Sequence, residues 1–469
     1  MGTITKGAEI ELQVEKLAFG GKGLSRVDGY VVFLDRAAPG QIVKALITKK
    51  KRNYAEARVL ETISRAPGYR PPACGHFGVC GGCFWQDISY EEQLFWKKAH
   101  ISECLEHIGG AGGIHVEPVM ASPDVFHYRN KMEFTFSDRR WLLAEELEQD
   151  FAPQSLFGLG LHVRGLFQKV LNIDSCFLQS PDASSILREV RQWAAASGLA
   201  AYSVRTHEGF WRFLVIREAK ATGQLLLHLI TSGVPEANDR VDLLAAHLLS
   251  RFPRITTFIH SISAKSSQVA VGDSSRVLFG PGHIEEMLGE LRFRISAHSF
   301  FQTNTRAALK LYDTIGRLAA FDGSEKVWDL YCGTGSIGLY IASRVKSVIG
   351  IELIEEAVRD ARENCILNNI DNCSFFGGDL KDVIAKASQT GRPDVVIVDP
   401  PRAGMHPKVV KSLLETLPEK IIAVSCNPAS LARDAALLLE AYTIGQVQPI
   451  DLFPHTPHLE CVVRFDKKR

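Results

Sequence analysis

The sequence predicts three parts: a small N-terminal β-barrel, a central α+β domain, and a C-terminal α/β domain of the Rossmann type with a parallel-rich sheet. Short β-like runs between glycine turns indicate the barrel, and strand-like runs that alternate with helical ones indicate the C-terminal fold. At about 100–200 residues per domain, the 469 residues favour three domains. We place these domains at 1–65, 66–290 and 291–469.

The composition excludes several classes of protein. Hydrophobic residues make up 46% of the chain and charged residues 23%, which is typical of a globular protein rather than a disordered or fibrous one. No apolar run reaches the roughly 18–20 residues needed to span a bilayer, and the N-terminus lacks the apolar core of a secretory signal. We therefore expect a cytoplasmic protein with no membrane partner, and we take it to be a monomer.

The N-terminal segment is basic although the whole chain carries a net charge of only +1. Residues 1–70 hold 13 Lys/Arg against 7 Asp/Glu, and their β-like runs lie at 10–17, 30–34, 42–47 and 57–63. The run Lys49–Arg52 places four cations beside Tyr54, a combination suited to a nucleic-acid backbone and base. A solvated charged surface is the alternative interpretation of these cations.

The central region begins after a proline-rich joint at 66–72. A helix is predicted over 89–109, with Leu94, Ile101, Leu105 and Ile108 roughly on one face, and we expect it to pack on the C-terminal domain. Strands are predicted at 131–136, 212–217 and 224–230. The central region shows no catalytic motif.

The C-terminal part alternates strand-like and helical runs, which predicts βαβ units and a parallel sheet. Its strand-like runs lie at 326–330, 347–351, 394–398 and 420–424. Ligands of such sheets bind beyond the carboxyl ends of the strands. Most of the chemically suggestive motifs of the chain fall at these ends.

A glycine-rich turn follows the first of these strands. Gly333-Thr-Gly335-Ser-Ile-Gly338 has the spacing that lets backbone approach a nucleotide closely, and the next strand ends at Glu352, whose carboxylate can accept hydrogen bonds from ribose hydroxyls. This pattern alone does not separate a dinucleotide from S-adenosylmethionine. Another strand ends in Asp399-Pro-Pro-Arg402, without the aromatic that often follows Asp-Pro-Pro in enzymes that methylate amino nitrogens.

Cys426 follows the strand-like run at 420–424 and is a candidate nucleophile. One reaction that requires a cysteine nucleophile is methylation of uracil at carbon 5, because this carbon is a poor nucleophile in the aromatic ring. Addition of a thiolate to carbon 6 creates an enolate, so that carbon 5 can take a methyl group, and a base must then remove the carbon 5 proton. A buried, inert thiol is the alternative for a single cysteine.

Five motifs in one order resemble the RNA 5-methyluridine methyltransferase family: Phe300-Phe-Gln-Thr-Asn304, Asp329-Leu-Tyr-Cys-Gly-Thr-Gly335, Asp399-Pro-Pro-Arg402, Ser425-Cys-Asn-Pro428 and His455-Thr-Pro-His-Leu-Glu460. The resemblance covers nearly the whole chain, and the N-terminal barrel resembles the TRAM RNA-binding module. It implies that Cys426 is the nucleophile and Glu460 the base. It also implies an S-adenosylmethionine pocket lined by Gln302, Tyr331, Glu352, Asp379 and Asp399. Ser336 departs from the asparagine of some members and is given no role.

Three cysteines are crowded at Cys74, Cys80 and Cys83, which in a reducing compartment indicates a metal site or a cluster. Four thiolates are needed for a 4Fe–4S cluster or a structural zinc. Cys176 is the expected fourth ligand, and Cys104, which lies in the predicted helix, is its competitor. The family subset that methylates ribosomal RNA shows this arrangement with a 4Fe–4S cluster, whereas zinc or free thiols are the alternatives.

The resemblance favours 23S ribosomal RNA over transfer RNA as the partner, by analogy only. A radical S-adenosylmethionine enzyme is one alternative, but its cysteine motif has a first gap of three residues instead of five. A nicotinamide oxidoreductase would leave Cys426 and Glu460 unexplained. A non-catalytic RNA-binding protein would not need this thiol and carboxylate.

Overall fold

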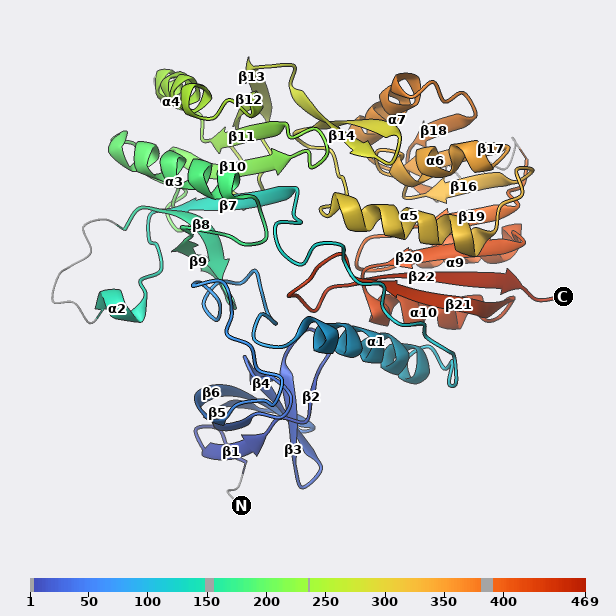
Figure 1. The fold of residues 1–469 in the computed structure, drawn as a ribbon, viewed down its shortest axis with the longest axis horizontal. Helices are drawn as coiled ribbons and strands as arrows, with labels where there is room; N and C mark the ends of the chain where they lie inside the picture. Colours follow the sequence, from blue (N-terminus) through green and yellow to red (C-terminus); the bar gives the residue numbers. More distant parts are fainter. Residues whose placement is uncertain (1–3, 148–155, 235–236, 381–390) are drawn as a thin grey trace.

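The computed structural model describes residues 4–147, 156–234, 237–380 and 391–469 (Figure 1). Along the described residues, large sheets of six, seven and seven strands follow one another, with a two-stranded sheet between the last two. In Figure 1 the N-terminal sheet lies apart from the other two, below the central sheet and helix α1. None of the described helices combines the length and apolarity needed to cross a bilayer.

The N-terminal sheet has the strand order β1-β5-β6-β4-β3-β2. Its strands are β1 (Glu9–Gln13), β2 (Lys16–Leu17), β3 (Gly23–Val27), β4 (Tyr30–Asp35), β5 (Ile42–Lys50) and β6 (Tyr54–Ser64). The predicted run 10–17 divides into β1 and β2. Strand β3 was not predicted, because Ser25 and Arg26 interrupt its apolar residues. Asp28 and Gly29 nevertheless have the positive φ angles of a tight hairpin turn between β3 and β4.

The central sheet has the order β13-β12-β11-β10-β7-β8-β9 and is antiparallel except for the β11–β12 pair. Three of its strands match the predicted runs: β7 (Lys131–Ser137), β10 (Trp211–Glu218) and β11 (Leu225–Thr231). The others are β8 (Gly158–Val163), β9 (Leu166–Asn172), β12 (Ile255–Ile262) and β13 (Ser274–Phe279). Helices α3 (Pro181–Ala196) and α4 (Asn238–Arg251) pack on this sheet, and α2 (Ala144–Leu147) is a single turn.

The C-terminal sheet has the order β18-β17-β16-β19-β20-β22-β21, preceded by the hairpin β14 (His283–Leu288) and β15 (Leu291–Ser296). Its strands are β16 (Lys326–Leu330), β17 (Ser347–Glu352), β18 (Cys373–Gly377), β19 (Val395–Val398), β20 (Lys420–Ser425), β21 (Tyr442–Ile450) and β22 (Glu460–Lys467). Among these described strands only β22 runs against its neighbours, so the sheet is mixed but rich in parallel pairs, as predicted. The helices of this part are α5 (Thr305–Ala319), α6 (Ser336–Ile341), α7 (Glu355–Leu367), α9 (Pro407–Thr416) and α10 (Pro428–Leu438).

Helix α1 (Tyr90–His107) begins after Ser89, whose side chain accepts a hydrogen bond from the backbone N–H of Glu92. The helix packs against α10 and β21 of the C-terminal part. The predicted apolar face is only partly correct, because Ile108 is 49% exposed. Polar side chains share the buried face instead, namely Gln93, Lys97 and His100.

Candidate active site

The proposed site residues gather at one edge of the C-terminal sheet. Strands β16 to β20 are parallel, so their carboxyl ends lie at the same edge, where ligands of such sheets bind. Five of the residues end or follow these strands in turn: Tyr331, Glu352, Asp379, Asp399 and Cys426. The antiparallel strand β22 begins at this edge, and its first residue is Glu460.

Cys426 and Glu460 are brought together by the β20–β22 ladder. Ser425, the last residue of β20, pairs with Cys461 of β22, so Cys426 directly follows β20 next to Glu460, the first residue of β22. Burial and the negative charges of Glu460 and Asp399 raise the pKa of Cys426 to about 12, while Arg402 lowers it. The surroundings of Cys426 in the free protein therefore disfavour its thiolate.

Glu460 is 5% exposed, and its Oε2 has no hydrogen-bond partner among the residues described. Burial and the charge of Asp399 raise the pKa of Glu460 well above its ordinary value. Burial also raises the pKa of Asp399, to about 7. The turn after Asp399 is tied to the cysteine turn, because Asn427 Nδ2 donates to the carbonyl of Arg402 at 2.8 Å.

The glycine turn adopts backbone conformations that favour glycine: φ is 55° at Gly333 and 75° at Gly335. A Cβ on Gly335 would lie 2.7 Å from the Phe375 ring, whereas one on Gly333 would meet nothing within 4 Å. Gly335 therefore serves close packing, and the space over Gly333 is open to a ligand. Glu352 Oε2 accepts from Gly333 N at 3.0 Å, and Oε1 accepts from Ile354 N at 3.0 Å, so each oxygen keeps a lone pair.

Gln302 lies just before α5 and is 7% exposed. The loop that carries it meets the glycine turn, because Thr334 Oγ1 donates to the carbonyl of Phe300 at 3.4 Å. Asn304 then caps α5 by accepting from Ala307 N at 3.1 Å. The upstream Phe-Phe-Gln-Thr-Asn motif is thus joined to the same edge of the sheet.

Two further residues, Asp329 and Tyr312, lie within this site, although neither was given a role from the sequence. Asp329 is fully buried, and its Oδ2 accepts from Gly338 N at 3.0 Å. Burial and the charge of Asp399 raise the pKa of Asp329 to about 8. Tyr312 Oη lies 2.8 Å from Ser336 Oγ. A carboxylate among the apolar residues Val327, Trp328 and Leu330 of β16 is the signal that could have identified Asp329.

Comparisons with known proteins agree with this geometry. The family model of tRNA (Uracil-5-)-methyltransferase matches residues 267–468, and that of the TRAM domain matches residues 4–60. An uncharacterized RNA methyltransferase of Chlorobaculum tepidum is 42% identical over 436 residues, which cover 92% of this chain and 90% of the relative. Another, of Porphyromonas gingivalis, is 41% identical over 462 residues, covering 96% and 98%.

A solved structure matches over nearly the full length. It is the Pyrococcus abyssi tRNA (uracil-54, C5)-methyltransferase in complex with S-adenosyl-L-homocysteine, with a TM-score of 0.75, 27% identity, and coverage of 97% of this chain and 100% of that one. The chain belongs to the RNA uracil-5 methyltransferase family. It is an S-adenosylmethionine-dependent enzyme of RNA with an N-terminal TRAM domain, as the resemblance implied. A nicotinamide oxidoreductase and a non-catalytic RNA-binding protein are set aside.

The four cysteines proposed as ligands in this methyltransferase line one cavity: Cys74, Cys80, Cys83 and Cys176. All four are free thiols, and burial raises the pKa of Cys80 to about 11 and that of Cys83 to about 12. Cys104 does not line this cavity, because it lies on the buried face of α1. Over the described ranges, however, no three His, Cys, Asp or Glu side chains are arranged closely enough to hold a metal ion.

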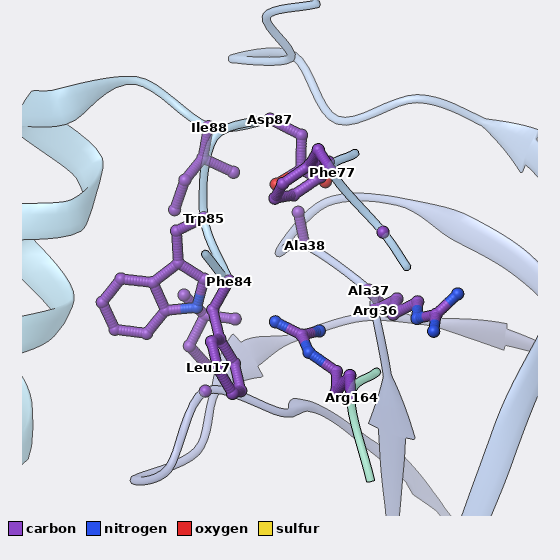
Figure 2. A pocket seen from close by; sticks show the side chains of 12 residues that line it. Leu17, Arg36, Ala37, Ala38, Phe77, Phe84, Trp85, Asp87, Ile88 and Arg164 are labelled. Atoms are coloured by element: carbon purple, nitrogen blue, oxygen red, sulfur yellow. The ribbon is translucent and has the colours of Figure 1, made fainter. Parts of the chain in front are cut away.

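The cysteine segment lies between the TRAM domain and the central sheet. Figure 2 shows a second pocket, in which Leu17 of the TRAM domain lies beside Phe84 and Trp85, which follow Cys83, and Ala38 lies beside Phe77. Arg164, at the end of β8, lies 3.6 Å from the centre of the Phe84 ring and donates from Nη2 to the carbonyl of Cys83 at 3.0 Å. The cysteine segment therefore contacts the TRAM domain at this second pocket, whereas the cavity of the four cysteines is lined by the segment itself and by residues 161–178 of the central region.

The cation run of the TRAM domain is less available than the sequence suggested. Lys49 forms an ion pair with Glu56 at 3.1 Å, and Lys50 donates to the carbonyl of Ile4 at 2.7 Å. Lys51 and Arg52 are exposed at the β5–β6 turn. All four cations are exposed, but Lys51 and Arg52 take part in neither of these two contacts.

Proposed function

We propose that this enzyme methylates carbon 5 of a uridine in 23S ribosomal RNA through a covalent adduct between Cys426 and uracil carbon 6. The observation that carries the proposal is the facing pair of Cys426 and Glu460 at the sheet edge that also holds the glycine turn. Membership of the uracil-5 family supplies the target atom. The exposed Arg402, in place of a stacking aromatic, agrees with a target other than an amino nitrogen.

In the proposed reaction, Cys426 first gives up its proton to solvent water, and the thiolate sulfur then adds to carbon 6. The electrons of the carbon 5–carbon 6 double bond move to the carbonyl oxygen on carbon 4, giving an enolate, and carbon 5 becomes nucleophilic. Glu460 later removes the proton from carbon 5, the double bond forms again, and the thiolate leaves. Glu460 must be ionised before it takes this proton; burial and the charge of Asp399, which raise its pKa, make its carboxylate a stronger base once it is formed.

The methyl donor would bind over the glycine turn. S-Adenosylmethionine supplies an electrophilic methyl group on its sulfonium sulfur. Glu352 would accept from its ribose hydroxyls with the lone pairs left by its two backbone hydrogen bonds. The other residues proposed to line this pocket are Gln302, Tyr331, Asp379 and Asp399.

We further propose that Cys74, Cys80, Cys83 and Cys176 hold a 4Fe–4S cluster with a structural or RNA-positioning role. Four half-buried thiols around one cavity are the donor set that such a cluster requires. Bound iron would stabilise the thiolates, which burial disfavours in the free protein. The four cysteine side chains would have to lie closer together to bind a cluster, since among the described residues no three possible ligands are close enough to hold a metal ion.

The choice of ribosomal RNA rests on this cysteine pattern. The matched Pyrococcus abyssi enzyme acts on uracil 54 of transfer RNA, so transfer RNA is the second candidate. The RNA-binding TRAM domain is compatible with either substrate.

The test is transfer of a labelled methyl group to 23S ribosomal RNA and to transfer RNA transcripts, followed by mapping of 5-methyluridine. We expect labelled ribosomal RNA with the wild type and none with Cys426→Ala. Cys365→Ala is the matched control, because Cys365 is a buried thiol on α7. Substantial turnover by Cys426→Ala would refute the covalent mechanism, and labelling of transfer RNA alone would refute the choice of RNA.

A further inference from the structure

The loop before Glu460 joins the last two strands of the sheet. Ile450 of β21 pairs with Glu460 of β22, and residues 451–459 form the connecting loop between them. In Figure 1 this loop, drawn in red, reaches from the C-terminal sheet toward the start of α1. Because Glu460 Oε2 has no hydrogen-bond partner among the described residues, the position of the carboxylate depends on the backbone that carries it.

Helix α1 holds the connecting loop at two points. Gln93 Oε1 accepts from His455 N at 2.8 Å, and Gln93 Nε2 lies 3.2 Å from His455 Nδ1. One turn further along, Lys97 Nζ donates to Asp451 Oδ1 at 2.6 Å and to the carbonyl of Phe453 at 3.0 Å. Both side chains are fully buried, and a spacing of four residues places them on one face of the helix.

The other side of the loop is held by the segment after Cys83 and by the central region. Phe84 N and Trp85 N both donate to the carbonyl of His455, at 2.7 and 3.1 Å. The Phe126 ring stacks on the His455 ring with centroids 4.5 Å apart, and Tyr128 Oη donates to the carbonyl of Pro454 at 3.1 Å.

His455 has a φ of 65°, in the left-handed region that residues other than glycine seldom adopt. Such a conformation persists only where the surroundings hold it, and clusters at functional sites. Gln93 stabilises this conformation in two ways. It binds His455 directly, and its Nε2 donates to the carbonyl of Trp85 at 2.8 Å. The loop conformation therefore depends on a residue of α1.

We propose that Gln93 and Lys97 are positioning residues that hold Glu460 in place for removal of the carbon 5 proton. The inference rests on the proposed function, in which Glu460 acts only after methyl transfer. Loss of the contacts from Gln93 or Lys97 to the connecting loop should therefore slow release of the RNA from Cys426 and leave formation of the adduct intact. Gln93 also joins the loop to the cysteine segment, through Trp85.

The test is Gln93→Met, assayed with RNA and S-adenosylmethionine. Two quantities are measured: S-adenosylhomocysteine formed per chain in the first and later turnovers, and the fraction of protein bound covalently to RNA in denaturing gels. We expect a first turnover close to that of the wild type, later turnovers slower by roughly 10–100-fold, as for a misplaced catalytic group, and accumulation of the adduct. A merely structural role would lower the first and later turnovers together and would overturn the inference.

Gln448→Met is the matched control. Gln448 is also a buried glutamine, 7% exposed, and its Nε2 donates to the carbonyls of Pro118 and Pro449 at 2.9 and 3.1 Å. Its loss should not change the ratio of the first to later turnovers. Gln93→Glu keeps the acceptor for His455 N but loses the amide donors, so it should fall between the wild type and Gln93→Met, and it carries the test if the methionine variant does not fold.

Two outcomes separate this inference from the proposed function. If Glu460→Gln traps the adduct while both Gln93 variants release RNA like the wild type, the positioning role is wrong and the proposed function stands. If Glu460→Gln traps no adduct, or if Cys426→Ala turns over, the proposed function itself fails.

Discussion

Replacing Lys97 by methionine removes the cation from a buried ion pair between α1 and the connecting loop. Both side chains are 0% exposed, and Lys97 Nζ lies 2.6 Å from Asp451 Oδ1. In the variant, Asp451 keeps two donors, Phe453 N at 2.9 Å and Tyr90 Oη at 3.0 Å, but loses its cation. The carboxylate is then a buried charge with only partial compensation.

Breaking a buried ion pair by removing one partner costs about 3–5 kcal/mol, because the other charge stays buried. The two remaining donors place Lys97→Met near the lower end, at about 3 kcal/mol of unfolding free energy. The double variant Lys97→Met/Asp451→Asn removes both charges and should recover to within about 1.5 kcal/mol of the wild type.

The assay is urea unfolding at pH 7 with linear extrapolation of the unfolding free energy. Lys411→Met is the control, because Lys411 and Glu415 form a surface pair at 3.7 Å with side chains 78% and 65% exposed. Its removal should change the unfolding free energy by less than about 0.5 kcal/mol. If Lys97→Met changed the unfolding free energy by under about 1 kcal/mol, or if the double variant were no more stable than the single one, the buried charge would not govern stability here.

Three further predictions concern the proposed cluster cysteines, the exposed cations Lys51 and Arg52, and the buried Asp329. Protein purified without oxygen should contain about four irons per chain, and Cys176→Ser but not Cys104→Ser should lower the iron content; zinc without iron would contradict the cluster. Replacing Lys51 and Arg52 by glutamine should weaken RNA binding and flatten its salt dependence by roughly 0.7–0.9 for each phosphate that is no longer neutralised; an unchanged slope would mean that these cations are only solvated. The pKa of Asp329 is raised on folding to about 8, so its stabilising contribution is present below about pH 4 and is lost as the pH rises toward 8; the unfolding free energy of Asp329→Asn should therefore fall less over this range, and an equal fall would contradict the shift.

The sequence was most informative where local pattern and tertiary structure agree. The parallel strands β16, β19 and β20 are buried on both faces, so they read as continuous apolar runs, and their predicted positions match within a residue. Because the motifs lie at the carboxyl ends of such strands, the order of the strands alone gathers them at one edge. Cys426 could thus be proposed from its place after a predicted strand, whereas Glu460, the first residue of the antiparallel strand β22, was proposed only from the resemblance to the family.

The polar face of α1 could not be predicted in the same way. Gln93 and Lys97 look like surface residues of an amphipathic helix, and Asp451 lies 354 positions away from Lys97. Only the tertiary contact shows that they are buried and paired. The strand β3 and the ion pair of Lys49 were missed for a related reason, since partners elsewhere in the TRAM domain determine both.

Covalent catalysis by Cys426 can be tested by locating the site of attachment on RNA that contains 5-fluorouridine. Fluorine on carbon 5 does not leave as a proton does, so Glu460 cannot complete the release and the adduct should persist. With S-adenosylmethionine present, we predict a stable protein–RNA complex whose digestion and mass spectrometry place the nucleotide on Cys426, and no complex with Cys426→Ala. A complex that forms equally well with Cys426→Ala, or a nucleotide attached to another residue, would contradict the covalent mechanism.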